Sequence, residues 1–377
     1  MLENKRHLFD IPNDIVYLNC AYMSPLSRSV QDAGERAIQQ KMHPWTTSSE
    51  DFFGNSEKAK SMFAKLINGN TPDIAIIPSA SYGLAIAAKN IEIQRGQKIL
   101  VLEEQFPSNI YCWQERANET GAVVATVSAP EDKDWTAAIL ENIDDTVAVA
   151  ALPNNHWADG GLLDLEKIGN QLRKVGAKLV LDVTQSLGVL PFDIEKVRPD
   201  FLVAAAYKWL MGPYSIGFMY VAPSFQNGDP IEYNWLNRAG SEDFSGLVRY
   251  QEAYQPGAVR FDMGQRANFQ LLPMAIAALE QLLDWQPHKI YETIAQMNRT
   301  IATAANEIGL QSIPEALRAQ HFLGLEKKGG FDPDLLKKLA SRNIYLSMRG
   351  NSLRVTPHVY NTPEDTEKLI TALRELV

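Results

Sequence analysis

The sequence predicts an α/β fold: a large domain with a mainly parallel seven-stranded sheet covered by helices, plus a smaller α+β C-terminal domain. Two observations lead to this prediction. Short apolar runs alternate with segments of helical period over the first two thirds of the chain, which is typical of a parallel sheet. From about residue 271 this alternation gives way to long helical stretches and a few short strands. A chain of 377 residues with 45% hydrophobic content is long enough for two domains.

The predicted strands are apolar runs, which lie at Ile74–Ile77, Ile99–Leu102, Val123–Val127, Val147–Leu152, Leu179–Asp182, Phe201–Ala205 and Ile216–Val221. Apolar residues recur at helical spacing in the segments between them, namely Ser81–Asn90, Asn109–Glu119, Trp135–Asn142 and Leu165–Val175. Because helices that connect parallel strands cross over the sheet, we expect both faces of the sheet to be covered.

The chain is divided into an N-terminal arm of residues 1–20, a large domain of residues 21–270 and a small domain of residues 271–377. The small domain begins with the helical stretches Leu271–Trp285 and Tyr291–Ile308. Its short strands are predicted near His321–Leu325 and Leu353–Thr356. The pattern therefore predicts a change of architecture rather than a continuation of the sheet.

Composition excludes several classes of function. The net charge of −9 disfavours a nucleic-acid-binding surface, and no apolar run of about 18 residues predicts a membrane span. The first residues lack the apolar core of a signal peptide, and two cysteines are too few for a disulfide framework, so we expect a cytoplasmic protein. The six histidines show no metal-ligand spacing, and no Gly-x-Gly-x-x-Gly turn follows an early strand, as an NAD enzyme would need.

Lys208 is the residue that points most directly to chemistry. It follows the apolar run Phe201–Ala206, and a Gly-Pro turn comes after it. Lysine is rarely buried without a partner, and a desolvated lysine has a lowered pKa and forms Schiff bases with carbonyl compounds. The alternative is a structural lysine whose charged end reaches solvent at a strand tip.

Two further segments favour the reactive lysine. Asp182 ends the preceding strand, and the carboxyl ends of parallel strands meet at one edge of a sheet. In Ile74–Leu84 a strand, a turn of small residues and a helix start follow one another, and the backbone N–H groups of such a turn favour a phosphate. An amine, a buried acid and a phosphate cradle together suit pyridoxal phosphate, whose ring nitrogen needs an acid partner.

At these residues the chain resembles the class V aminotransferase family of fold-type-I enzymes, which includes cysteine desulfurases, kynureninases and isopenicillin-epimerase-like proteins. The most specific pieces are Tyr207-Lys208-Trp209-Leu210 and Asp182-x-x-Gln185, and the resemblance extends over nearly the whole chain. It implies that Lys208 holds the cofactor as a Schiff base and moves the substrate Cα proton. Asp182 is implied to pair with the pyridinium nitrogen.

The resemblance also implies residues for the two ends of the cofactor. Gln185 matches the position that contacts the phenolic oxygen, where kynureninases carry histidine. Ala80 and Ser81 should bind the phosphate from the helix start, with a plain helix cap as a compatible alternative. Tyr207 should hydrogen-bond the phosphate, and core packing is its alternative.

The resemblance also implies residues that contact the face of the cofactor ring and its oxygen. Phe106 matches the aromatic residue that stacks on the pyridine ring, with an ordinary loop aromatic as the alternative. Asn155 or His156 should contact the cofactor oxygen or the substrate, and the register is open by one residue. A structural role for His156 is equally compatible with the sequence.

The substrate side is implied by three further segments. Arg354 matches the arginine that binds the substrate α-carboxylate, because its planar guanidinium can form two parallel hydrogen bonds with a carboxylate. A salt bridge on the surface of the strand is the less favoured alternative. Residues from Asn19 to Tyr22 form the turn that closes over the substrate in such enzymes. Gln265 lies where the family often has threonine, in the segment that reaches the neighbouring subunit's site, and its amide can still donate to the phosphate.

These residues and the resemblance together predict a pyridoxal-phosphate enzyme that transaminates an amino acid and a keto acid, and the resemblance implies a homodimer with a shared active site. Persulfide chemistry is disfavoured because no cysteine follows Cys112 to supply a thiolate. Kynureninase is disfavoured by Gln185. Epimerisation and β-elimination need nearly the same residues and stay open as alternatives. An alternative outside the enzymes is a non-catalytic binding protein that kept the fold.

Overall fold

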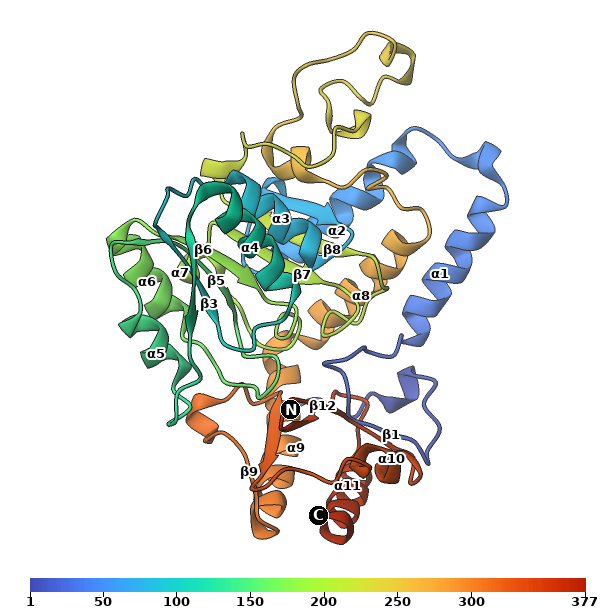
Figure 1. Ribbon diagram of the computed structural model, residues 1–377. Coiled ribbons are helices and arrows are strands. Elements are labelled where there is room, and N and C mark those ends of the chain that lie inside the picture. Colours follow the sequence, from blue (N-terminus) through green and yellow to red (C-terminus); the bar gives the residue numbers. More distant parts are fainter.

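The protein, represented by a computed structural model of residues 1–377, is built around a seven-stranded sheet (Figure 1). The strand order is β2-β8-β7-β6-β5-β3-β4. β8 runs antiparallel to its two neighbours, and the other strands are parallel to one another. Their bounds are β2 (Ile74–Ile77), β3 (Lys98–Leu102), β4 (Val123–Val127), β5 (Val147–Pro153), β6 (Lys178–Asp182), β7 (Phe201–Ala205) and β8 (Gly217–Val221).

Helices cover both faces of this sheet, as the alternating pattern predicts. Successive residues of a strand enter opposite cores, because side chains alternate across a pleated strand. Ile76 of β2 packs in the same core as Phe63 of α2, whereas Ile77 packs with Leu84 of α3. The helices of this domain are α1 (Arg28–Lys41), α2 (Gly54–Leu66), α3 (Ala80–Asn90), α4 (Ser108–Thr120), α5 (Trp135–Glu141), α6 (Leu165–Val175), α7 (Ile194–Val197) and α8 (Leu271–Trp285).

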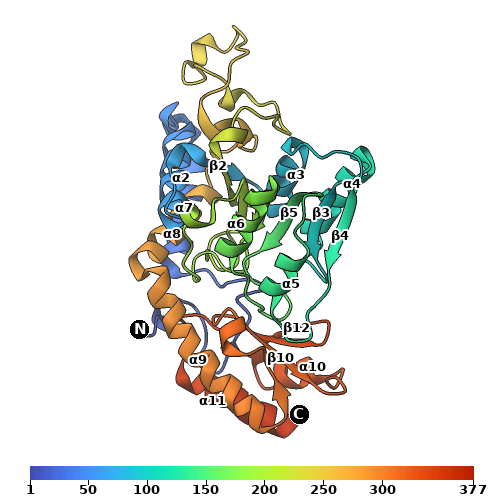
Figure 2. The ribbon, with the colours of Figure 1, turned by 90° about the vertical axis from the view of Figure 1, so that its left-hand side faces the viewer.

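The small domain is a four-stranded antiparallel sheet of order β12-β13-β10-β9 with helices packed on it. Figure 2 shows α9 running beside α11 along this domain. The N-terminal arm joins it, since β1 (Val16–Tyr17) pairs with β11. The remaining bounds are α9 (Pro287–Glu307), β9 (Leu310–Gln311), β10 (Leu323–Lys327), α10 (Leu335–Ala340), β11 (Ile344–Tyr345), β12 (Ser347–Arg349), β13 (Ser352–Val355) and α11 (Pro363–Leu376).

The predicted fold class is confirmed, and each predicted strand of the large sheet agrees with an observed strand to within one residue at either end. The domain boundary at residue 271 stays a prediction. α8 packs against α1 and α2 of the large domain, while α9 packs against α11 of the small one. We therefore propose that the boundary lies at Gln286, between these two helices, where the backbone takes a φ of 65°. No helix is both long enough and apolar enough to cross a membrane.

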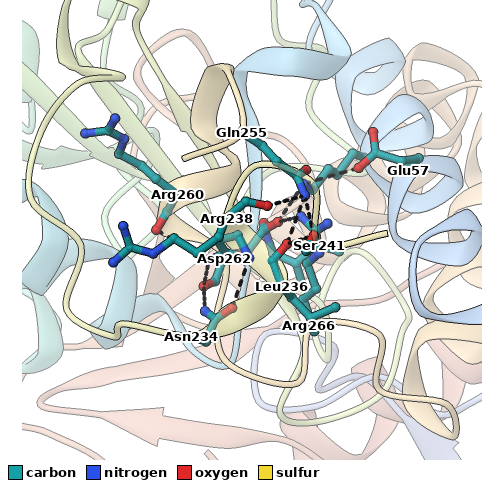
Figure 3. Close-up of polar contacts among 12 residues, drawn as sticks. Glu57, Asn234, Leu236, Arg238, Ser241, Gln255, Arg260, Asp262 and Arg266 are labelled. Carbon is teal, nitrogen blue, oxygen red and sulfur yellow. Dashed lines mark hydrogen bonds and ion pairs between the residues drawn. The ribbon is translucent and has the colours of Figure 1, made fainter. Parts of the chain in front are cut away.

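A buried ion-pair network holds the segment that joins β8 to α8 (Figure 3). The carboxylate of Asp262 accepts a hydrogen bond from Lys60 Nζ at 2.7 Å, forms an ion pair with Arg266, and accepts a third bond from the main-chain N–H of Ile76. All three charged side chains are at most 1% exposed. The carbonyl of Asp262 also accepts hydrogen bonds from the side-chain amides of Asn234 and Asn237. Asp262 therefore attaches the long connection between β8 and α8 to the edge strand β2.

Asp262→Ala leaves two buried cations without their shared anion, so we expect the free energy of unfolding to fall by about 3–5 kcal/mol. Equilibrium urea unfolding measures the change. The matched control is Asp243→Ala, which removes a carboxylate 3.6 Å from Arg249 on an exposed loop and should cost less than about 1 kcal/mol. Equal losses in the two variants would contradict a stabilising role for the buried network.

Candidate active site

A cavity of about 410 Å³ opens at the carboxyl ends of the parallel strands, where ligands bind in open α/β sheets. A second cavity of about 380 Å³ adjoins it on the side of the small domain, and both are lined by Lys208, Phe106, Tyr207, Trp157 and Tyr214. The combined space lies between the two domains. Its size is that of a site for a small molecule.

Lys208 lies at the centre of this space. Its side chain is almost fully buried, and its Nζ has no hydrogen bond or ion pair with another side chain. The pKa of this amine is lowered to about 8, mainly by burial and in smaller part by the positive charges of Arg354 and Arg349, while the charge of Asp182 opposes the shift. A lysine with a pKa near neutrality is largely an uncharged amine at mildly alkaline pH, which is the nucleophilic form.

The turn that presents Lys208 is tight and strained. Met211 and Ser215 take positive φ values of 55° and 64°, which L-residues rarely adopt. Hydrogen bonds from the amide of Ala206 to Ile216 and from Gly212 to Ala206 close the turn. Gly188 is required beside it, because a Cβ at that position would meet the carbonyl oxygen of Trp209 at 2.4 Å. Strain of this kind is typical of backbone that is held in place for function.

Asp182 supplies an acid at the tip of the adjacent strand β6. Its carboxylate is buried and accepts one hydrogen bond from the amide of Thr184, and no cation lies within ion-pair distance. Burial raises the pKa of this carboxyl group above its usual range. A buried carboxylate without a cation is costly. A protonated ring nitrogen would supply the missing partner, so this position fits the cofactor predicted from the sequence.

The start of α3 forms a cradle at the other end of the cavity. Ser79 caps the helix by accepting a hydrogen bond from the amide of Tyr82, and its hydroxyl also contacts that of Ser81. The amides of Ala80 and Ser81 lie in the first turn, where a helix offers no internal acceptor. These groups line the cavity and fit a phosphate, which a helix N-terminus favours.

Gln185, Phe106 and Tyr207 line the walls between these two ends. The amide of Gln185 donates to the carbonyl of Ala21 and accepts from the indole of Trp209, which leaves one amide N–H for a ligand oxygen. The ring centroids of Phe106 and Tyr207 lie 5.3 and 5.5 Å from Lys208 Nζ. Burial raises the pKa of Tyr207 to about 12, so its hydroxyl stays a hydrogen-bond donor.

Arg354 reaches the adjoining cavity from β13 of the small domain. It is 1% exposed, and it donates to the hydroxyl of Ser347 and to the carbonyl of Trp157. Ser347 in turn donates to the side-chain oxygen of Asn19 at 2.7 Å. Asn19 therefore acts on this cavity by orienting Arg354, whereas Tyr22 lines the cavity directly and is 54% exposed.

Three of the predicted cofactor-binding residues do not line the cavity. His156 stacks on Trp135, and its two ring nitrogens contact Asp159 and the carbonyl of Glu103, which is a structural arrangement. Asn155 is fully buried with its side-chain oxygen unpaired. Gln265 is exposed at the surface of its own chain, so a contact with cofactor requires a second subunit. Roles for these three in binding the cofactor stay predictions.

Sequence reasoning missed several lining residues, among them Trp157, Thr184, Tyr214 and Arg349. Trp157 and Arg349 come from different domains, and no local pattern marks them as neighbours. Thr184 lies two residues after Asp182, so its place beside that strand tip was available from the sequence. Its amide donates to the carboxylate of Asp182, and its hydroxyl accepts from the amide of Ala205.

Comparison with known proteins identifies the family. The family model described as Aminotransferase class-V matches residues 37–369 of this chain. The chain therefore belongs to the class V aminotransferase family, whose members are pyridoxal-phosphate-dependent enzymes, and both the predicted family and its cofactor are confirmed at this level.

The relatives do not share one activity. "Uncharacterized aminotransferase YcbU" of Bacillus subtilis (strain 168) is 26% identical over 93% of this chain and 90% of the relative. The kynureninase of Deinococcus radiodurans is 27% identical over 75% of this chain and 68% of the relative, and the isopenicillin N epimerase of Streptomyces clavuligerus is 23% identical over 66% and 64%. The sequence comparisons thus support the enzyme family and leave the particular reaction open.

Solved structures share the fold at low identity. The apo cysteine desulfurase of Thermococcus onnurineus NA1 superposes with a TM-score of 0.86 at 18% identity, over 100% of this chain and 99% of that one. A C-DES mutant with glycine covalently linked to the PLP cofactor superposes with a TM-score of 0.89 at 18% identity, over 99% and 100%. These similarities establish the same fold.

The pKa of Lys208 can be measured on the cofactor-free protein. The rate at which a neutral acylating reagent labels Lys208 should rise through about pH 8, because the reactive species is the uncharged amine. Quantitative mass spectrometry of the labelled peptide gives the midpoint. Asp182→Asn should lower this midpoint, since the carboxylate stabilises the ammonium form, and Arg354→Gln should raise it. A wild-type midpoint near the ordinary value of about 10.4 would contradict the assignment.

Proposed function

We propose that this chain is a pyridoxal-phosphate-dependent aminotransferase acting on an amino acid and a keto acid. The observation that carries the proposal is the placement of Lys208 and Asp182 at the ends of adjacent strands, lining one cavity with the start of α3. An amine, an acid and a phosphate cradle are thus available to one planar ligand. When bound, pyridoxal phosphate supplies an aldehyde for the amine and a ring that withdraws electrons from the substrate Cα.

The chain's own residues divide the work of holding the ligands. Asp182 holds the proton of the ring nitrogen, while Ala80 and Ser81 bind the phosphate through the first turn of α3. Phe106 limits the tilt of the ring from one side. Arg354 binds the α-carboxylate of the amino acid, because a guanidinium matches a carboxylate in shape and charge.

Lys208 moves the proton. With substrate bound, its Nζ would act as the general base that takes the Cα proton of the amino acid and as the general acid that gives it back. Lys208 is the one amine that lines the cavity. Transamination needs a single base on one face. Epimerisation needs a proton donor on the opposite face as well, and the lining tyrosines Tyr22, Tyr207 and Tyr214 keep it open as an alternative.

The cysteines argue against desulfuration. Cys20 is fully buried and its Sγ lies 3.9 Å from the carbonyl oxygen of Lys208, and burial raises the pKa of its thiol. Burial also raises the pKa of Cys112 on α4 to about 12. Neither group is a thiolate near neutral pH, so neither is suited to accept sulfur from a substrate. Elimination at the β-carbon needs no cysteine and is the second candidate, because Lys208 would start it in the same way.

We also propose that the enzyme is a homodimer with a shared site. Tyr22 and Tyr214 line the cavity and are 54% and 62% exposed, and exposed apolar surface often marks a protein–protein interface. Gln265 is exposed on a backbone with a φ of 59°. A second subunit that covers the mouth would bury these tyrosines, and its Gln265 would be free to reach the phosphate.

Half-transamination tests the proposed reaction. The holoenzyme mixed with single amino acids should lose the visible absorbance of its cofactor and release the matching keto acid in equal amount, while a keto acid should restore the absorbance. Chromatography identifies the product. Release of ammonia, of a keto acid that lacks the β-substituent and of that substituent itself, in place of a stable amine form of the cofactor, would favour elimination, and inversion of the amino acid would favour epimerisation.

Lys208→Ala should abolish turnover, lowering kcat at least about 1000-fold, because the same amine binds the cofactor and moves the proton. Borohydride should fix the cofactor to the peptide that contains Lys208 in the wild type and to no peptide in the variant, as mass spectrometry would show. Lys196→Ala, on the exposed surface of α7, is the control and should keep full activity. Fixation at another lysine would overturn the assignment.

A further inference from the structure

We propose that Arg349 selects amino acids that carry a second acidic group, so that the preferred substrate is a dicarboxylic amino acid. The inference rests on the proposed function of the same site and adds the substrate class to it. Arg354 would bind the α-carboxylate, and Arg349 would bind the acidic group of the side chain.

The hairpin β12–β13 places both arginines on one face. Ser347 pairs with Arg354 and Arg349 pairs with Ser352. Directly paired residues of antiparallel strands share a face, and so do residues two apart on one strand. Arg349 is therefore a diagonal neighbour of Arg354 on the face that closes the cavity, two pairs nearer to the turn of the hairpin.

Both guanidinium groups lie near the ring of Trp157. The guanidinium carbons of Arg349 and Arg354 each lie 5.7 Å from the centroid of its ring. The indole is fixed from the other side, where its N–H donates to the carbonyl of Glu104 at 2.6 Å. Both arginines line the cavity that also contains Lys208. Two cations thus face the amine at which the substrate reacts.

Neither arginine has an anionic partner in the protein. Arg354 donates to Ser347 and to the carbonyl of Trp157, and Arg349 donates to the carbonyl of Met348. The carboxylate of Glu104 lies near Gly350 on the adjoining turn, yet it forms no ion pair with Arg349. Burial, and secondly the charge of Arg349, lowers the pKa of Arg354 to about 9, as expected of cations that await an anion.

Position separates the roles of the two arginines. Arg354 is fully buried beside Lys208, where an α-carboxylate must lie if the Cα is to meet the amine. Arg349 is only partly buried and lies nearer the hairpin turn, so a group bound to it belongs to the part of the substrate that points away from the reacting carbon. The arrangement suits two separated carboxylates better than one carboxylate shared by both cations.

Amide isosteres of the acidic substrates test the inference on the holoenzyme. The kcat/KM for L-glutamate or L-aspartate should exceed that for L-glutamine or L-asparagine about ten- to hundredfold, since a charged hydrogen bond is lost with the amide. Arg349→Gln should reduce this ratio to about 1, and Arg349→Lys should retain part of it. Arg342→Gln, an exposed arginine on the same domain that pairs with Glu375, should leave the ratio as in the wild type.

Calorimetry provides a readout that does not need turnover. Glutarate should bind the holoenzyme about ten- to hundredfold more tightly than valerate, and Arg349→Gln should remove this difference. Equal loss for glutamate and glutamine in Arg349→Gln would overturn the inference, because Arg349 would then serve the common α-carboxylate. A wild type that transaminates both equally would overturn it while the proposed function stands. If no amino acid reacts, the proposed function fails, and tighter binding of glutarate still supports the dicarboxylate site.

Discussion

The whole site depends on the desolvation of two groups of opposite charge at neighbouring strand tips. Lys208 and Asp182 are both buried, yet they make no ion pair with each other. Each would be stabilised by a partner, and the space between them leaves room for a planar ligand that partners both. Burial lowers the pKa of the amine and raises that of the carboxyl group, so the protein itself prepares a nucleophile and a proton acceptor.

Strand pairing and a tight turn fix the backbone around these groups. The sheet fixes Asp182 and the end of β7 side by side, and the strained turn at Met211 and Ser215 fixes the lysine above them. On the other side, Gly83 lets α3 approach β7 closely, because a Cβ there would meet Val203 at 2.6 Å. The cradle at the start of α3 is thereby held at a constant distance from the amine.

The small domain contributes the positive charge. Asn19, Ser347 and Arg354 form a chain of hydrogen bonds that links the N-terminal arm to the hairpin β12–β13. The same arm pairs with β11, so its packing and the orientation of the arginine are coupled. The space is thus lined by the acidic Asp182 on the side of the large sheet and by the basic Arg349 and Arg354 on the side of the small domain.

The sequence by itself determined the fold class, the seven strands and the family, and it predicted Lys208 and Asp182, which line one cavity. It could do so because period-two and helical patterns are local, and because a charged residue that ends an apolar run is visible without coordinates. The helix start at Ala80 and Ser81 was visible for the same reason.

Only the tertiary structure decided which residues share the cavity. Trp157 and Arg349 come from different domains and contact each other, although they are far apart in the chain and no sequence pattern links them. His156 could equally face the ligand or the core as far as the sequence shows, and its contacts with Trp135 and Asp159 place it in the core. The orientation of a side chain depends on the neighbours that packing supplies, and those neighbours come from distant parts of the chain.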